Sequence, residues 1–219
     1  MGKYILLITT AALLYVNNVM GQQNYKEVLT KTFLAFDTTR DLSTKIEQSN
    51  KLSLIAKKWS DEWATHYYAA YSKAQLAYMS EGEEKRDAYL DEAEKERDEA
   101  VSMLGKNNDE TYVLSAMIAN ARMAVNPRSR WQKYGKIFEE NLDKARELNA
   151  DNPRIYYLQG TSKFFTPKMF GGGKKAALPY FEKADGLFAK ESTDDIADPY
   201  WGKINNDYFL GMCHGEDKE

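Results

Sequence analysis

The stretch Asn152–Ala184, NPRIYYLQGTSKFFTPKMFGGGKKAALPYFEKA, contains two apolar segments that are joined by a loop with three consecutive glycines. In the first segment, Tyr156 and Gly160 are one helical turn apart. In the second, a 4-then-3 spacing separates Ala177, Phe181 and Ala184. Residues at these spacings lie on one face of a helix, and small residues among them let two helices approach closely. The stretch therefore predicts an antiparallel helical hairpin.

The same pattern occurs earlier in the chain. Tyr112 and Ala116 are again one turn apart, and the segment that follows carries the trio Phe138, Leu142 and Ala145. A less regular unit precedes it, with Trp63 and Tyr67 in the first segment and Ala93, Arg97 and Ala100 in the second. Units of two helices that recur along a chain predict a helical-hairpin solenoid.

These units resemble tetratricopeptide repeats (TPRs), whose first helix carries an aromatic and then a small residue and whose second helix carries Ala-x3-Phe-x2-Ala. The resemblance implies an all-α fold: a right-handed solenoid of about three antiparallel hairpins in residues 59–219, preceded by a helical segment over residues 22–58. A last helix from Pro199 is expected to act as a cap. The matching alanines Ala100, Ala145 and Ala184 are 45 and 39 residues apart, which exceeds the usual period of about 34, so longer helices or loops are expected.

The chain as a whole also looks similar to exported helical-repeat proteins of Bacteroidetes-type bacteria. A second likeness is to the tetratricopeptide component of some periplasmic solute transporters, which shares a glycine-containing hairpin loop. These resemblances imply a binding protein in the cell envelope.

Residues 1–21 are typical of a secretory signal peptide that is cut after Gly21. One lysine precedes an apolar run of 13 residues from Tyr4 to Val16, and a membrane-spanning helix needs about 20. An uncleaved anchor is the alternative. Cleavage predicts a periplasmic or secreted protein without membrane insertion.

Composition restricts the partners. The 219 residues have a formal net charge of −3, so a nucleic-acid partner is not expected. Cys213 is the only cysteine, so no intramolecular disulfide can form. Abundant Ala, Leu, Lys and Glu with few Val and Ile favour helices over strands.

The loop with three glycines could in principle hold a phosphate. A phosphate loop needs glycines that open directly into a helix, usually after a strand, with a Ser or Thr after the lysine. No Ser or Thr follows here, and Pro179 predicts that the helix begins near Ala176 or Ala177. We expect a structural hairpin loop, with an anion or partner contact by Lys168, Lys174 and Lys175 as the alternative.

No catalytic residue, metal ligand set or cofactor site is predicted. The chain has two histidines. His66 has no partner at a suggestive spacing, and His214 follows Cys213 near the end of the chain. Nucleophile, base and orienting group therefore cannot be assembled from the sequence. We expect a non-enzymatic protein.

If the geometry of the repeats holds, the first helices line a concave surface. The resemblance then implies that the partner is contacted by Val113, Met117, Asn120, Tyr157, Thr161 and Phe164. The leading hypothesis is a scaffold or adaptor that binds an envelope protein or peptide through this surface. The alternative is a periplasmic solute-binding or transport-accessory protein that holds a small molecule in an aromatic groove.

Overall fold

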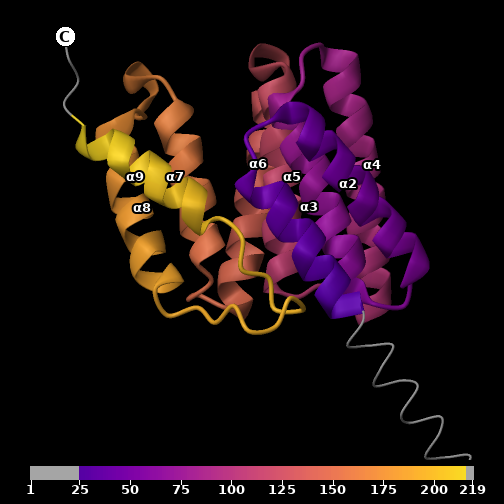
Figure 1. Cartoon of the computed structure of the whole chain (residues 1–219). Helices are drawn as coiled ribbons and strands as arrows, with labels where there is room; N and C mark the ends of the chain where they lie inside the picture. The colour runs from indigo at the N-terminus through magenta and orange to yellow at the C-terminus, as the bar shows by residue number, and fades with distance from the viewer. Residues whose placement is uncertain (1–24, 216–219) are drawn as a thin grey trace, which may run out of the picture.

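The computed structural model describes residues 25–215, and this part of the chain contains helices and no strand (Figure 1). The predicted all-α fold is confirmed. The predicted signal peptide, residues 1–21, lies outside the described residues. A helix covers residues 25–38. It is followed by α2 (Leu42–Lys58), α3 (Trp63–Met79), α4 (Glu83–Leu104), α5 (Asp109–Val125), α6 (Pro127–Leu148), α7 (Pro153–Phe165), the short 3-10 helix η1 (Lys168–Phe170), α8 (Lys174–Phe188) and α9 (Lys203–His214).

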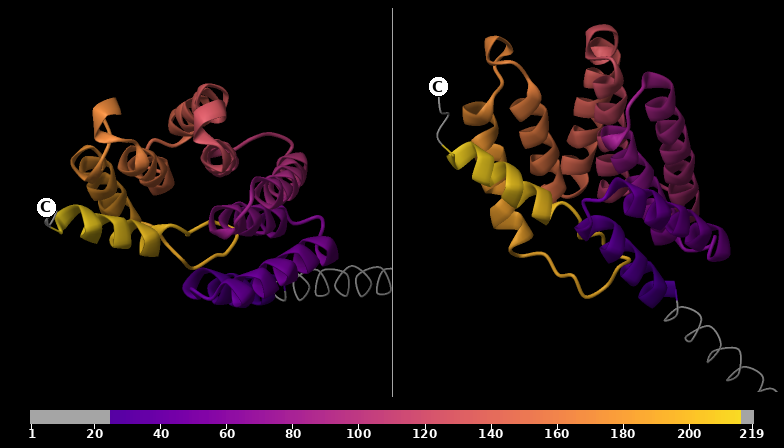
Figure 2. Two further views of the ribbon diagram at one scale, coloured as in Figure 1. Left: turned by 90° about the horizontal axis from the view of Figure 1, so that it is seen from above. Right: turned by 45° about the horizontal axis from the view of Figure 1, so that its top comes forward.

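The helices pack as successive hairpins. The most extensive contacts join α3 to α4, α5 to α6 and α7 to α8, while α3, α5 and α7 also contact one another in order. Seen from above, the hairpins form a curved row, and the indigo helix over residues 25–38 and yellow α9 lie at its two ends (Figure 2). We call the side of the row that α3, α5 and α7 line the inner face.

The predicted trios hold the hairpins together. Phe138, Leu142 and Ala145 of α6 are buried, as are Ala177, Phe181 and Ala184 of α8. Gly160 of α7 lies against the Phe181 ring so closely that a β-carbon at position 160 would be 2.6 Å from the nearest ring atom. The small residue is therefore required by the close approach of α7 and α8, as the spacing predicts.

Two of the predicted helix starts are wrong. α8 begins at Lys174, directly after Gly173, so Pro179 lies inside the helix rather than in its first turn. The helix tolerates this proline because the carbonyl of Lys175, which would have accepted the missing hydrogen bond, belongs to an exposed residue that water can reach. The last helix begins at Lys203, and Pro199 belongs to the preceding connection.

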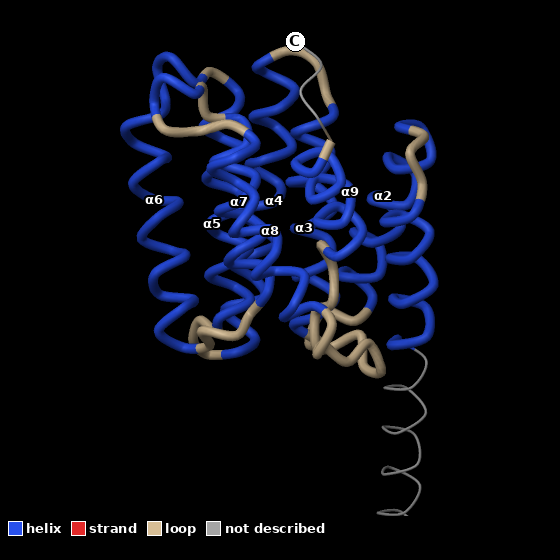
Figure 3. Tube along the Cα trace, turned by 90° about the vertical axis from the view of Figure 1, so that its left-hand side faces the viewer, coloured by secondary structure: helices blue, strands red, loops and turns tan. Residues whose placement is uncertain are grey.

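That connection, residues 189–202, is the long non-helical segment between α8 and α9 (Figure 3). It carries Trp201, which is fully buried, and Gly202, whose φ of 106° is in the left-handed region that favours glycine. The chain thus needs an irregular segment here to bring Trp201 into the core before α9 can start.

No helix in residues 25–215 is long and apolar enough to cross a membrane.

Candidate functional site

The inner face is filled at one end by Trp201. The indole Nε1 donates to the Tyr67 hydroxyl at 2.7 Å, and the Trp201 ring packs 4.7 Å from the Tyr71 ring and 6.2 Å from the Tyr157 ring, centroid to centroid. Tyr67 and Tyr71 belong to the middle of α3, and Tyr157 belongs to the second turn of α7. Helices that are distant in the sequence are therefore joined by one side chain from the 189–202 connection.

Next to Trp201, a buried ionic network links α3, α5, α7 and the 189–202 connection. The Arg154 guanidinium donates to Glu110 of α5 at 2.7 Å, to Glu191 of the connection at 2.7 Å and to the Trp201 carbonyl at 3.2 Å. The Tyr67 hydroxyl completes the network by donating to Glu110 at 2.6 Å. Burial raises the pKa of Glu191, and the ion pair with Arg154 opposes that shift.

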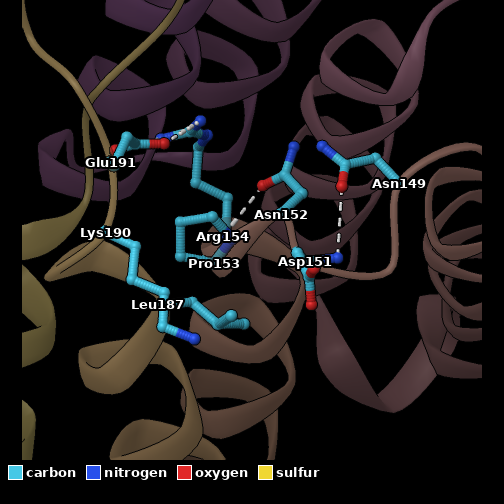
Figure 4. Close-up of a pocket in the computed structure, with 8 residues that line it drawn as sticks. All are labelled: Asn149, Asp151, Asn152, Pro153, Arg154, Leu187, Lys190 and Glu191. Carbon is cyan, nitrogen blue, oxygen red and sulfur yellow. Dashed lines mark hydrogen bonds and ion pairs between the residues drawn. The ribbon is translucent and has the colours of Figure 1, made fainter.

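A pocket of about 250 Å³ opens beside this network, where Arg154 and Glu191 face each other (Figure 4). Its lining residues are Asn149, Asp151, Asn152, Pro153, Arg154, Leu187, Lys190 and Glu191. The Arg154 guanidinium is already saturated by two carboxylates and a carbonyl, so it is not available to hold a bound anion. The network therefore has a structural role: it holds α5, α7 and the 189–202 connection together.

The predicted contact residues are spread along the inner face: Tyr157 lies beside Trp201, whereas Asn120, Thr161 and Phe164 belong to the later turns of α5 and α7. Val113 is fully buried, Met117 is 2% exposed and Tyr157 is 7% exposed. The expectation that Val113, Met117 and Tyr157 face a partner is therefore wrong, because all three side chains are buried in the core that α3, α5 and α7 share. Asn120, Thr161 and Phe164 keep part of their surface exposed.

Tyr78, in the last turn of α3, extends this partly exposed surface. It is 38% exposed, and its hydroxyl donates to the Met117 carbonyl of α5 at 3.2 Å. Met79, the last residue of α3, is also exposed. The sequence does not single out Tyr78, because nothing local distinguishes an exposed tyrosine from a packed one.

On α7, Phe164 belongs to an aromatic cluster that includes side chains of α8 and α9. Its ring lies 5.2 Å from that of Phe165 and 5.2 Å from that of Phe209 in α9. Phe209 in turn stacks on Phe181, with centroids 5.5 Å apart. The sequence does not predict the part of Phe209 in this cluster, because that depends on how α9 folds back on the last hairpin.

The loop with three glycines is closed on itself. Four consecutive amide groups, at residues 170–173, donate to backbone carbonyls nearby. The acceptors are Pro167 and Lys168 in the loop and Lys163 in α7. Because these donors are already used, they cannot form an anion-binding nest. The glycines do open directly into α8, contrary to expectation, yet the loop serves to turn the chain.

The described residues offer no metal-binding site. Among residues 25–215, no group of three or more His, Cys, Asp and Glu side chains could hold an ion. His66 is buried between α3 and α4, where Nδ1 lies 2.7 Å from Glu96 and Nε2 lies 3.3 Å from the Ser60 carbonyl. The hydrogen bond with Glu96 raises the pKa of His66. Both ring nitrogens are thus engaged in the fold.

The fold and this surface define a protein of helical hairpins with a partly exposed, aromatic inner face. No protein-family model and no curated protein matches the sequence. Among solved structures, the HusA haemophore from Porphyromonas gingivalis matches with a TM-score of 0.74 and 34% identity, over 89% of this chain and 95% of that chain. The chain belongs to the family of this haemophore.

Proposed function

We propose that the protein binds haem or a related porphyrin outside the cell and has no catalytic activity. The observation that carries this proposal is the 34% identity with a haemophore over 95% of that chain. A porphyrin is a large flat ring system with two apolar faces and a carboxylate edge. Aromatic and methionine side chains suit such faces, because they offer broad apolar surface with few polar atoms to desolvate.

The ligand is best accommodated on the inner face near the end of α3 and α7. Trp201 occupies the other end of that face, where it contacts Tyr67 and Tyr71. Two pockets among the described residues, of about 250 and 120 Å³, are smaller than the roughly 300–1,000 Å³ of ordinary ligand pockets. A porphyrin would therefore lie against Tyr78, Met79 and Phe164 rather than enter either pocket.

Stacking supplies the affinity in this proposal, and iron coordination is secondary. His66 is engaged by Glu96 and is buried away from the inner face. Tyr157 is 7% exposed and its ring packs against Trp201, so this side chain is likewise engaged in the fold. An iron-free porphyrin should accordingly bind with an affinity similar to that of haem.

Arg86 is the candidate for the carboxylate edge. It lies in the first turn of α4, where Nε donates to the Ala77 carbonyl at 3.0 Å. That bond fixes the guanidinium next to the last turn of α3 and leaves its remaining donors for a carboxylate, a pairing that is often bidentate.

Titration of the protein with haem and with iron-free protoporphyrin tests the proposal. We expect saturable binding of both, with absorbance changes for haem and fluorescence changes for the iron-free ring. Tyr78→Ala and Phe164→Ala should each weaken binding about ten-fold, which corresponds to about 1.4 kcal/mol of lost contact. Trp131→Ala, an exposed aromatic on the outer helix α6, is the matched control and should leave the affinity unchanged. Absence of saturable binding of either porphyrin would refute the proposal.

An adaptor for an envelope protein or peptide, built on a TPR-like solenoid, is the second candidate. The partial exposure of Asn120, Thr161 and Phe164 favours it, because these side chains form a mixed polar and apolar row that a peptide could contact. If no porphyrin binds and cross-linking in the envelope captures a protein that is lost on Thr161→Arg and Phe164→Ala, the adaptor function takes precedence.

A further inference from the structure

The end of α7 and its connection to α8 expose three large apolar side chains to solvent. Met169 is 82% exposed, Phe165 is 71% exposed and Phe170 is 70% exposed. A soluble protein normally leaves such residues exposed one at a time, and a group of them marks an interaction surface. We call residues 163–175 the α7–α8 tip.

The tip holds these side chains outward by its own hydrogen bonds. Gly171 and Gly173 have φ values of 80° and 96°, and the Gly173 amide donates to the Lys163 carbonyl at 2.9 Å. At Gly172, a β-carbon would lie 2.1 Å from the Thr166 carbonyl oxygen. Backbone atoms therefore fill the interior of the loop. Because of this, the Met169 and Phe170 side chains have no room inside it and point outward.

The tip is also basic. Four lysines occur in it, at positions 163, 168, 174 and 175, and no Asp or Glu occurs from Ile155 to Phe181, although the whole chain has a net charge of −3. Lys163 and Lys175 are exposed. Positive charge is therefore concentrated around the exposed apolar side chains.

A second connection at the same end of the molecule has similar chemistry. The α5–α6 and α7–α8 connections both lie at the upper end in the view of Figure 1, the end away from the 189–202 connection. Trp131, in the second turn of α6, is 58% exposed, and exposed Arg128 and Lys133 flank it in the sequence. The α3–α4 connection at this end carries Glu81, Glu83 and Glu84 instead, which directs any anionic surface toward α6 and α7.

We propose that this end of the molecule docks on an anionic lipid surface. Met169, Phe170 and Phe165 would enter the interfacial region, Trp131 would lie at headgroup level, and Lys163 and Lys175 would reach lipid phosphates. Three exposed apolar side chains among lysines suit an anionic lipid interface better than a protein, because a stable protein interface buries about 800 Å² on each partner. The inference is independent of the porphyrin proposal.

Sedimentation with lipid vesicles tests the inference. The protein is isolated as the cell exports it, its N-terminus is determined by mass spectrometry, and every variant is prepared in the same way. Vesicles of phosphatidylcholine alone are compared with an equimolar mixture of phosphatidylcholine and phosphatidylglycerol. We expect binding to the mixture, weaker binding at high salt and little binding to phosphatidylcholine alone.

Two variants separate the apolar and basic contributions. Met169→Glu with Phe170→Glu should weaken binding at least ten-fold, and Lys163→Gln with Lys175→Gln should weaken it about 25-fold, since each lysine near an anionic surface contributes a factor of about five. The control, Leu54→Glu with Ile204→Glu, changes two residues that are 63% and 55% exposed on other helices and should bind as the parent does.

The inference is overturned if the parent does not sediment with anionic vesicles, or if the Met169 and Phe170 variant sediments as well as the parent. Envelope association that depends on the tip without any vesicle binding would likewise overturn it and would assign the tip to a protein partner.

Discussion

Gly160→Ala tests whether the close approach of α7 and α8 holds the last hairpin together. The new β-carbon would lie 2.6 and 2.7 Å from two atoms of the Phe181 ring, whereas carbon atoms in contact are about 3.5–4.0 Å apart. The ring or the helix must then move by about 1 Å to restore ordinary contact. Phe181 is fully buried and stacks on Phe209, with an angle of only 5° between the two ring planes. The Phe181 ring therefore cannot move without disturbing α9.

Two opposing effects set the change in the free energy of unfolding of Gly160→Ala. Overpacking in a core costs about 1–3 kcal/mol, and alanine in a helix interior gains about 1 kcal/mol over glycine. Because the contact is short and the ring is held on its far side, we expect Gly160→Ala to lower the free energy of unfolding by about 1–2 kcal/mol. The melting temperature should fall by roughly 2–8 °C for a domain of this size.

Gly135→Ala in α6 is the matched control, since the nearest atom to a β-carbon there is Met123 Sδ at 3.9 Å. It should raise the free energy of unfolding by up to about 1 kcal/mol. Urea unfolding followed by circular dichroism measures both variants. A Gly160→Ala protein as stable as the parent would refute the reasoning. A second test introduces Phe181→Leu, in whose background the cost of Gly160→Ala should shrink by at least about 0.5 kcal/mol.

Two further predictions concern the joints between hairpins. Trp201→Ala should lower the free energy of unfolding by about 3–5 kcal/mol in urea, because it empties a fully buried site, whereas exposed Trp131→Ala should change it by no more than about 0.5 kcal/mol. The Arg130 guanidinium, with help from Arg122, lowers the pKa of Asp87 to about 2. Asp87 therefore contributes stability above its ordinary pKa that is lost as the pH falls toward 2, and Asp87→Asn should remove this part of the acid dependence. The effect should be about 1 kcal/mol, since the carboxylate is partly exposed to solvent. An unchanged acid limb of the stability curve in Asp87→Asn would contradict this assignment.

Local signals in the sequence predict where most helices lie. Asn108 caps α5 (Asp109–Val125) through its side chain, as an asparagine before a helix should. Such starts depend on residues within one turn, so they can be recognised without knowledge of the fold.

The predictions are wrong where tertiary contacts determine the helix start or the burial of a side chain. Pro199 is a good first residue for a helix, yet the chain stays irregular until Trp201 is seated against Tyr67 and Tyr71. Similarly, the resemblance to tetratricopeptide repeats implies that Val113 lies on an open concave face, but the contacts of α3 and α7 with α5 bury it. No sequence pattern within a single hairpin carries this information, because the partners come from other hairpins and from the 189–202 connection.

Burial also changes which substitutions can test the function. Charged residues at Met117 or Tyr157 would be placed in the core, where an unpaired charge is costly, so a loss of binding would only report unfolding. Tyr78 and Phe164 avoid this problem, since part of each side chain is accessible. Both lie in the last turns of α3 and α7, at the end of the molecule that carries the α7–α8 tip. A porphyrin bound there would be close to the lipid surface proposed to hold the tip. The two proposals nevertheless fail separately: vesicle binding should survive Tyr78→Ala, and porphyrin binding in solution should survive the change of Met169 and Phe170 to glutamate.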